Sequence, residues 1–318
     1  MLRVGVDETM PSELLSLFPP QVEIVRIPRK PAQPVDVDFW IIAFNTREAS
    51  ETFKHLRGVK VVQALLAGVD RILTWLPPGI ALCDGRGIHD ISTSEWVVTA
   101  ILASLKNIPT YVRHQLNGEW IGQGATALPS ERIGSYRVLS EDLADRTVLI
   151  VGYGSIGAAI EKRLAPFGVN VVRVARTPKQ TPQVHAVSEL PQLLPQADIV
   201  VLIVPLTEQT RGMIGAKELA LMKENALLVN AARGPVVDAD ALLTALQSER
   251  IHAALDVTDP EPLPPGHPLW SAPNCLITPH VAGSTPQYLA RGIRFAAEQL
   301  RRYLDGQPLE NQVSEAGY

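Results

Sequence analysis

Three polar side chains that suit carbonyl chemistry each follow an apolar run of the sequence. Arg233 follows ALLVN, Glu261 lies in a proline-rich loop after HAALDV, and His280 follows CLIT. A guanidinium binds a carboxylate and stabilises a carbonyl oxygen on which negative charge develops. An imidazole donates a proton near neutral pH, and a carboxylate on its other nitrogen orients the ring. Each residue alone is more often structural or exposed, but the three in this order suit the reduction of a carbonyl group.

A glycine-rich stretch, VLIVGYGSIGAAI, precedes these residues and places Gly152, Gly154 and Gly157 between an apolar run and a helical pattern. In this context the first glycine permits a tight turn, the second lets a diphosphate approach the backbone, and the third lets the helix pack closely on the strand. The N-terminus of the helix then offers free N–H groups to the phosphates. The alternative is a turn of purely structural importance. The surrounding strand and helix pattern favours a dinucleotide site.

The end of the next apolar run carries positive charge where a dinucleotide site usually has an acid. Ala175 stands where a carboxylate would accept hydrogen bonds from the adenosine ribose, and Arg176, Thr177 and Lys179 follow it. A guanidinium and an ammonium group suit a phosphate on the 2′-oxygen, which a carboxylate would repel. A solvated basic loop is the alternative. The pattern favours NADP(H) as the cofactor, with NAD(H) as the second candidate.

The elements that must position these residues are strands alternating with helices in both halves of the chain, which predicts an α/β fold with two parallel sheets. Strands are expected at Leu2–Val6, Val22–Ile27, Phe39–Ala43, Val59–Gln63, Thr147–Val151, Val169–Val174, Ile199–Val204, Ala226–Asn230, His252–Asp256 and Cys275–Thr278. Helices are expected at Thr46–Leu56, Ser94–Leu105 and Gln287–Leu304, and an irregular stretch over Gly118–Ser135. Because the carboxyl ends of parallel strands line the ligand crevice, the three polar residues should gather there.

The composition excludes several other classes of protein. The 318 residues are 46% hydrophobic and 19% charged, which suits one or two folded domains rather than a disordered chain. The net charge of −4 gives no reason to expect nucleic acid or an anionic membrane as a partner. The two cysteines, Cys83 and Cys275, support neither a disulfide framework nor a metal site. No apolar stretch reaches the ~18–20 residues of a membrane helix, and the N-terminus does not read as a signal peptide, so a cytoplasmic protein is expected.

Over nearly its full length the chain resembles the D-isomer-specific 2-hydroxyacid dehydrogenases. The segments that carry the resemblance are LLAGVDRI, NGEW, VGYGSIG, VPLTEQTRG, LVNAARGPVVD, ALDVTDPEPLP and TPHVAGST. The resemblance implies that Arg233, Glu261 and His280 are the catalytic set. It also implies that Asp256 lies near the nicotinamide carboxamide, and that the backbone N–H groups of Leu66, Ala67 and Gly68 bind the substrate carboxylate together with Arg233.

The same resemblance implies two Rossmann-like domains, with the cofactor domain inserted into a discontinuous substrate domain. The substrate-binding domain would comprise residues 1–92 and 285–318, and the dinucleotide-binding domain residues 93–284. The resemblance further implies a homodimer formed through the cofactor domain. The residues expected to bind the cofactor are Gly152, Gly154, Ser155, Ile156, Gly157, Arg176, Thr177, Lys179, Pro205, Thr210, Ala231, Ala232 and Asp256.

Within the family, the ARTPK segment and the LLAGVDRI loop are most similar to NADPH-dependent glyoxylate/hydroxypyruvate reductases. Phosphoglycerate and phosphite dehydrogenases carry a basic residue in the loop where this chain has Leu65 and Leu66. Formate dehydrogenases carry a glutamine before the catalytic histidine, where this chain has Pro279. Two departures from the family, Thr258 in place of an aromatic residue and His252 in place of glycine, leave the substrate size open.

The sequence therefore predicts an enzyme that reduces a small 2-keto acid, such as glyoxylate or hydroxypyruvate, to the D-2-hydroxy acid with NADPH. A dehydrogenase of the same family with a bulkier substrate is one alternative. A second alternative, from another class, is a non-catalytic sensor or corepressor that binds NAD(P)(H) with the same fold. Turnover of a short 2-keto acid distinguishes the enzyme from the sensor.

Overall fold

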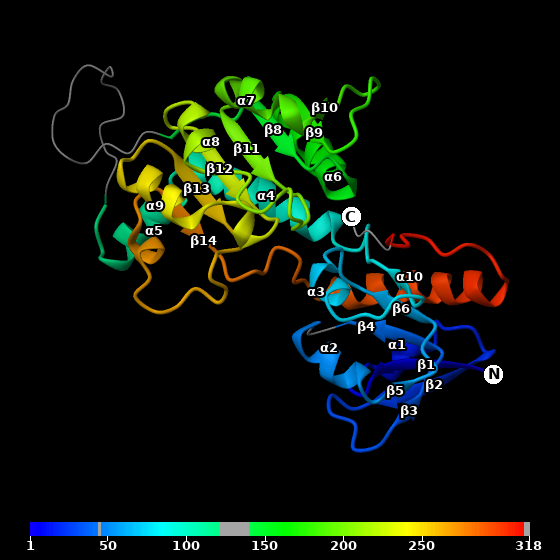
Figure 1. The fold of residues 1–318 in the computed structure, drawn as a ribbon. Coiled ribbons are helices and arrows are strands. Elements are labelled where there is room, and N and C mark those ends of the chain that lie inside the picture. The colour runs from blue at the N-terminus through cyan, green and yellow to red at the C-terminus, as the bar shows by residue number, and fades with distance from the viewer. Residues whose placement is uncertain (44–45, 121–139, 315–318) are drawn as a thin grey trace, which may run out of the picture. The chain divides into compact units, whose positions relative to one another are not determined.

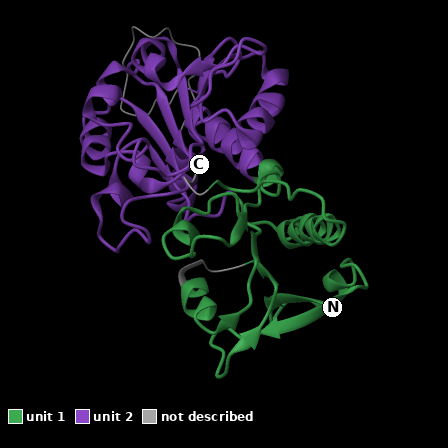
Figure 2. Ribbon diagram, turned by 45° about the vertical axis from the view of Figure 1, so that its right-hand side comes forward, with its two compact units in different colours: residues 1–92, 283–318 green, residues 93–282 purple. Residues whose placement is uncertain are grey.

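The computed structural model describes residues 1–43, 46–120 and 140–314. The chain divides into two compact units, residues 1–92 with 283–318 and residues 93–282, which we call unit 1 and unit 2 (Figure 2). Unit 2 is thus inserted in the sequence of unit 1. Of the irregular stretch predicted over Gly118–Ser135, residues 121–135 lie outside the described residues.

Unit 2 contains a seven-stranded sheet in the order β10-β9-β8-β11-β12-β13-β14, and every neighbouring pair is parallel (Figure 1). The chain builds outward from β8 to β10 and then crosses to β11 on the other side of β8. In open parallel sheets, ligands bind at the carboxyl ends of the strands where the order reverses in this way. The strands are β8 (Thr147–Val151), β9 (Asn170–Ala175), β10 (His185–Ala186), β11 (Ile199–Leu202), β12 (Leu227–Asn230), β13 (His252–Leu255) and β14 (Cys275–Ile277).

Helices cover both faces of this sheet. Along β8, Leu149 and Val151 pack in one buried layer with α7, α8 and α9, whereas Val148 and Ile150 pack in the other layer with α4 and α6. Strands buried on both faces read as continuous apolar runs, which is the pattern of this half of the sequence. The helices are α4 (Asp90–Leu105), α5 (Ile108–Leu116), α6 (Ser155–Leu164), α7 (Leu190–Leu193), α8 (Ala216–Leu221) and α9 (Ala239–Gln247). Short 3-10 helices span Ala165–Phe167, Val187–Glu189, Leu194–Gln196, Gly234–Val236 and Pro268–Ser271.

Unit 1 contains a five-stranded parallel sheet in the order β2-β1-β4-β6-β7. Along β4, Phe39 and Ile41 pack with α1 and α10, whereas Trp40 and Ile42 pack with α2 and α3. The strands are β1 (Leu2–Asp7), β2 (Val22–Ile27), β4 (Phe39–Ile42), β6 (Val61–Ala64) and β7 (Ala81–Cys83), and a separate pair is β3 (Val35–Asp36) with β5 (Leu56–Arg57). The helices are α1 (Ser12–Leu15), α2 (Thr46–Phe53), α3 (Asp70–Leu73) and α10 (Gln287–Leu304).

The predicted fold class, α/β with two parallel sheets and one unit inserted into the other, is confirmed. The last helix begins and ends as predicted, at Gln287–Leu304. The sequence did not predict α5, which follows α4 after the two residues Lys106 and Asn107, the second of them left-handed with a φ of 53°. Pro109 lies in the first turn of α5, where a proline starts a new helix as readily as it ends the previous one. The short strands β7 and β10 also went unpredicted because they give little periodic signal.

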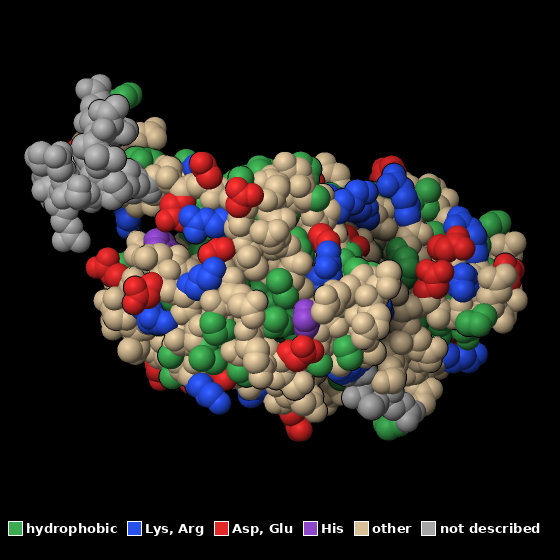
Figure 3. Space-filling view, turned by 90° about the horizontal axis from the view of Figure 1, so that it is seen from above, with side chains coloured by type: hydrophobic (Ala, Val, Ile, Leu, Met, Phe, Trp, Pro, Cys, Tyr) green, Lys and Arg blue, Asp and Glu red, His purple; other side chains and the backbone are tan. Residues whose placement is uncertain are grey.

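Charges of both signs are distributed over the molecular surface. On the face in Figure 3, Lys and Arg side chains alternate with Asp and Glu side chains among apolar ones, in keeping with the net charge of −4. Within the described ranges, no helix has the length and apolar character needed to cross a membrane.

Candidate active site

The imidazole of His280 is hydrogen-bonded to the carboxylate of Glu261. The distance from His280 Nδ1 to Glu261 Oε1 is 2.9 Å, and the His280 side chain keeps 45% of its surface exposed. A carboxylate at Nδ1 requires a proton on that nitrogen, which leaves Nε2 to exchange a proton with a ligand. Residues that stand 19 positions apart in the sequence thus form an oriented acid–base pair.

The loop that carries His280 is fixed by a buried carboxylate at the end of β13. Asp256 is only 2% exposed, and its oxygens accept hydrogen bonds from Thr278 Oγ1 at 2.6 Å and from the backbone N–H groups of Val281 and Ala282 at 2.9 Å. The backbone N–H of His280 donates to the Asp256 carbonyl at 2.7 Å, and His280 has a φ of 57°. The sequence related Asp256 to the cofactor and gave no sign of this role in holding the loop.

The loop that carries Arg233 is fixed by Asn230, the last residue of β12. The buried Asn230 side chain accepts from Ala232 N at 3.0 Å and donates to the Arg233 carbonyl at 3.1 Å. The Arg233 guanidinium donates to the Ala232 carbonyl at 2.7 Å. Sequence reasoning missed Asn230, although a buried amide at a strand end is a recognisable signal of a side chain that shapes the next loop.

Gly234 packs the Arg233 loop directly on the loop that leads to Glu261. A Cβ added at Gly234 would lie 1.9 Å from the carbonyl oxygen of Thr258 and 2.7 Å from Asp259 N. Only a residue without a side chain allows this approach, so the loops after β12 and β13 meet backbone to backbone. The structure therefore brings His280 and Glu261 into direct contact and places the Arg233 loop against the Glu261 loop.

The glycine loop has the local geometry that a diphosphate requires. Gly152 has a φ of 107°. A Cβ added there would lie 2.6 Å from the backbone of Ile203, the residue that follows β11. A Cβ at Gly157 would lie 3.0 Å from the Gly152 carbonyl, which reflects the close packing of α6 on the loop. A Cβ at Gly154 would meet open space. This open space lies at the N-terminus of the helix that begins at Ser155 and Ile156, where backbone N–H groups have no partner within the helix.

The remaining residues predicted to bind the cofactor lie in loops at the carboxyl ends of the strands. Arg176, Thr177 and Lys179 are exposed after β9, and the Lys179 backbone is held by two hydrogen bonds with Val184, at 3.0 and 2.8 Å. Thr210 Oγ1 donates to the Pro205 carbonyl at 2.6 Å, in the loop after β11. Ala231 and Ala232 follow β12, next to Arg233.

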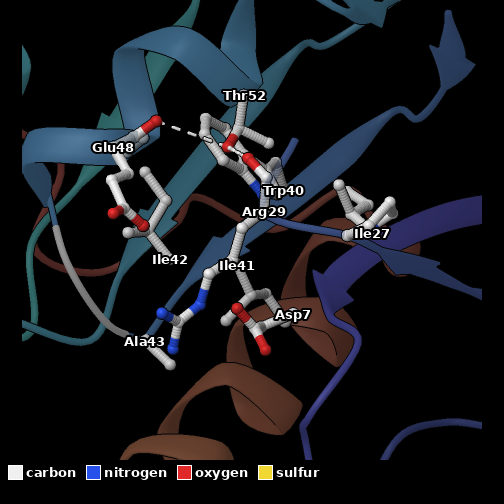
Figure 4. Close-up of a pocket in the computed structure, with 11 residues that line it drawn as sticks. Asp7, Ile27, Arg29, Trp40, Ile41, Ile42, Ala43, Glu48 and Thr52 are labelled. Carbon is white, nitrogen blue, oxygen red and sulfur yellow. Dashed lines mark hydrogen bonds between the residues drawn. The ribbon is translucent and has the colours of Figure 1, made fainter. Parts of the chain in front are cut away.

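Unit 1 holds the loop predicted to bind the substrate carboxylate. Leu66, Ala67 and Gly68 connect β6 to α3, and Gly85 N donates to the Leu66 carbonyl at 2.8 Å. A separate pocket in unit 1, lined by Asp7, Arg29, Trp40 and Glu48 among others, lies where β1, β2 and β4 end (Figure 4). It contains none of the site residues that the sequence predicted. Among the described residues, no cluster of His, Cys, Asp and Glu is arranged to hold a metal ion.

Comparisons with known proteins agree with this arrangement. Residues 98–282 match the family model described as the NAD binding domain of D-isomer specific 2-hydroxyacid dehydrogenases. The chain is 32% identical over 286 residues to a D-3-phosphoglycerate dehydrogenase of Methanocaldococcus jannaschii, covering 88% of this chain but only about half, 52%, of that longer relative. It is 35% identical to glyoxylate/hydroxypyruvate reductase B of Escherichia fergusonii, over 70% of this chain and 67% of the relative.

A solved structure also resembles the whole chain. The NADPH-dependent glyoxylate/hydroxypyruvate reductase of Sinorhizobium meliloti, determined in complex with NADP and sulfate, is 26% identical and superimposes with a TM-score of 0.83. The match covers 100% of this chain and 99% of that one. The names of these relatives give different substrates, so the comparisons establish the family and not the substrate.

Proposed function

Because the chain belongs to the D-isomer-specific 2-hydroxyacid dehydrogenases, a family of NAD(P)-binding oxidoreductases, we propose that it reduces a small 2-keto acid to the D-2-hydroxy acid with NADPH. Glyoxylate and hydroxypyruvate are the substrates that we favour. The observation that carries the proposal is the His280–Glu261 pair at the carboxyl ends of the unit 2 strands, 2.9 Å between Nδ1 and Oε1.

When bound, a reduced nicotinamide would supply the hydride that the carbonyl carbon of the substrate accepts in the proposed reaction. Negative charge then develops on the carbonyl oxygen, and the Arg233 guanidinium stabilises it. His280 donates a proton to the same oxygen from Nε2, because Nδ1 is occupied by Glu261. Glu261 keeps the ring oriented through its hydrogen bond with Nδ1. The backbone N–H groups of Leu66, Ala67 and Gly68 bind the substrate carboxylate in this proposal.

The proposed preference for NADP(H) rests on the residues after β9. Ala175 offers no carboxylate to the ribose, and the exposed Arg176 and Lys179 supply two cations for a 2′-phosphate. The Lys179 backbone forms two hydrogen bonds with Val184, so the turn that follows Lys179 is held before any ligand binds. The Sinorhizobium meliloti relative with NADP bound supports this preference.

We also propose that the protein is a homodimer formed through unit 2. Support comes from α5, where Ile108, Val112 and Leu116 repeat every four residues and all lie exposed, Leu116 at 81%. Trp120, just beyond the helix, is 84% exposed. An apolar stripe of this kind usually marks a protein interface. Light scattering of the purified protein measures the assembly, and a monomer at micromolar concentration would contradict it.

The experiment that tests the proposed function is a substrate panel with both cofactors. NADPH absorbance is followed on adding glyoxylate, hydroxypyruvate, pyruvate and longer 2-keto acids, and kcat/KM is compared with NADPH and NADH. We expect the highest kcat/KM with a short 2-keto acid and NADPH. Tight NADPH binding without turnover of any 2-keto acid would support a sensor in place of an enzyme.

A further inference from the structure

The residue between the first two glycines of the loop is clamped by two charged side chains. The Tyr153 hydroxyl donates to Glu161 Oε2 at 2.6 Å, and Glu161 lies on α6, the helix that begins at the loop. Arg173, on β9, donates from Nε to the same oxygen at 2.7 Å and from Nη2 to Oε1. The Arg173 guanidinium carbon also lies 5.6 Å from the centre of the Tyr153 ring. Three elements, the loop, α6 and β9, are therefore joined through one carboxylate.

The three side chains are mostly buried and hold complementary charge. The Arg173 and Glu161 side chains are 20% and 23% exposed. Hydrogen bonds from Arg173 lower the pKa of Glu161, and burial together with the Glu161 charge raises the pKa of Tyr153. At neutral pH the carboxylate is thus ionised and the phenol protonated, which gives charge-assisted hydrogen bonds, the stronger kind.

The backbone of the loop is tied to the same strand. The N–H groups of Gly152 and Tyr153 both donate to the Val174 carbonyl, at 2.8 and 2.9 Å. Val174 is two residues before Arg176, the proposed 2′-phosphate ligand. These hydrogen bonds therefore join the loop that would receive the diphosphate to the strand end that would receive the 2′-phosphate.

A glycine-rich loop left without such ties must be ordered when a ligand binds. Fixing a residue costs conformational entropy, and glycine loses more of it than other residues. A Cβ at Gly154 would meet nothing within 4 Å, so the contacts that hold this part of the loop are backbone hydrogen bonds and those of its neighbours. The Arg173 guanidinium is engaged by Glu161, which leaves Arg176 and Lys179 as the cations for the proposed 2′-phosphate.

We propose that Tyr153, Glu161 and Arg173 form a positioning cluster that holds the Gly152–Gly154 backbone in the conformation that binds the cofactor diphosphate. The cluster contains none of the residues assigned to the proposed reaction, Arg233, Glu261 and His280. The proposal rests on the proposed function only in that NADP(H) is the ligand of this loop. It assigns a role to three residues whose types the glycine pattern does not require.

The test measures cofactor binding directly, by quenching of protein fluorescence or by calorimetry with NADPH, and compares it with kcat at saturating NADPH. Tyr153→Phe removes the hydroxyl and keeps the ring. We expect the Kd for NADPH to rise about three- to tenfold, the size of one typical net hydrogen bond. The kcat at saturation should stay within about twofold, because the reacting groups are untouched. Arg173→Met should raise Kd at least as much.

Two controls separate positioning from general damage. Tyr303→Phe in α10 removes a tyrosine hydroxyl that forms no hydrogen bond within the described part of the chain, and it should leave Kd unchanged. Reduced nicotinamide riboside, which has no phosphate, should be used by wild type and Tyr153→Phe with the same kcat/KM. An unchanged Kd for NADPH in Tyr153→Phe overturns the proposal, and so does a parallel loss with the riboside. A wild-type protein that fails to bind NADPH would instead remove the proposed function itself.

Discussion

Replacing Gly234 by alanine should separate the two loops that position Arg233 and Glu261. The φ of Gly234 is outside the left-handed region, so the effect is steric and not a matter of backbone preference. The new Cβ would lie 1.9 Å from the Thr258 carbonyl oxygen, whereas real Cβ atoms do not approach other heavy atoms within 3.0 Å. The loops must therefore move apart by about 1 Å, and the atom in the way is backbone, which has little freedom to give. A misplacement of this size costs roughly 10²-fold in rate when it displaces a catalytic group.

The assay is kcat/KM for the best 2-keto acid, with the melting temperature measured in parallel. We expect a fall of about 10² in kcat/KM and a loss of roughly 1–3 kcal/mol of unfolding free energy, as for other overpacked sites. Gly215→Ala is the matched control, because a Cβ there meets nothing nearer than 3.6 Å, and it should retain activity. If Gly234→Ala keeps kcat/KM within about threefold of wild type, the close approach of these loops does not position the guanidinium and the reasoning is wrong.

Three further predictions concern substitutions of Arg176, Asp256 and Glu161. Arg176→Ala should raise KM for NADPH by about 10-fold or more while KM for NADH changes little, since hydrogen bonds to charged groups contribute about 1.5–3 kcal/mol. Equal changes for both cofactors would show that Arg176 does not bind a 2′-phosphate. Asp256→Asn should lower kcat and the melting temperature together, because the new amide NH2 group would face backbone N–H donors of the His280 loop in place of an acceptor. The loss of unfolding free energy, measured by chemical denaturation, should be about 1–3 kcal/mol. Arg173 lowers the pKa of Glu161 below its usual value of 4.5, so the stability that the Glu161 charge contributes is present above that pH and lost as pH falls through the lower, folded-state pKa. The difference in unfolding free energy between wild type and Glu161→Gln should accordingly shrink as the pH falls from neutral through 4.5, and a constant difference would contradict it.

The fold class could be predicted from the sequence because buried parallel strands are apolar along their length. Runs such as Val148–Val151 can therefore be recognised from local composition alone. The strand order could not be obtained in this way, since β8 and β11 pair across nearly 50 residues and nothing local distinguishes β11 from other apolar runs. The helix α5 was missed for a local reason. Asn107 separates α4 from α5 through a left-handed conformation that the residue type allows but does not require.

In the candidate site, too, some residues could be predicted from the sequence and the contacts that hold them could not. Arg233, Glu261 and His280 could be proposed from residue type, order and family resemblance. The groups that hold their loops could not, because Asp256 reaches residues 278–282 only after β13 and β14 have paired. Gly234 was visible as a glycine, but its contact with Thr258 depends on the packing of two loops that no local pattern records.

The proposed reaction depends on His280 as the proton donor to the keto oxygen. The most direct measurement is the kcat of His280→Ala at saturating NADPH and substrate, with the Kd for NADPH determined on the same preparation. We predict a fall in kcat of about 10²–10⁴, typical of a lost general acid, with Kd unchanged within about twofold. A variant that turns over near the wild-type rate would show that the proton comes from another group.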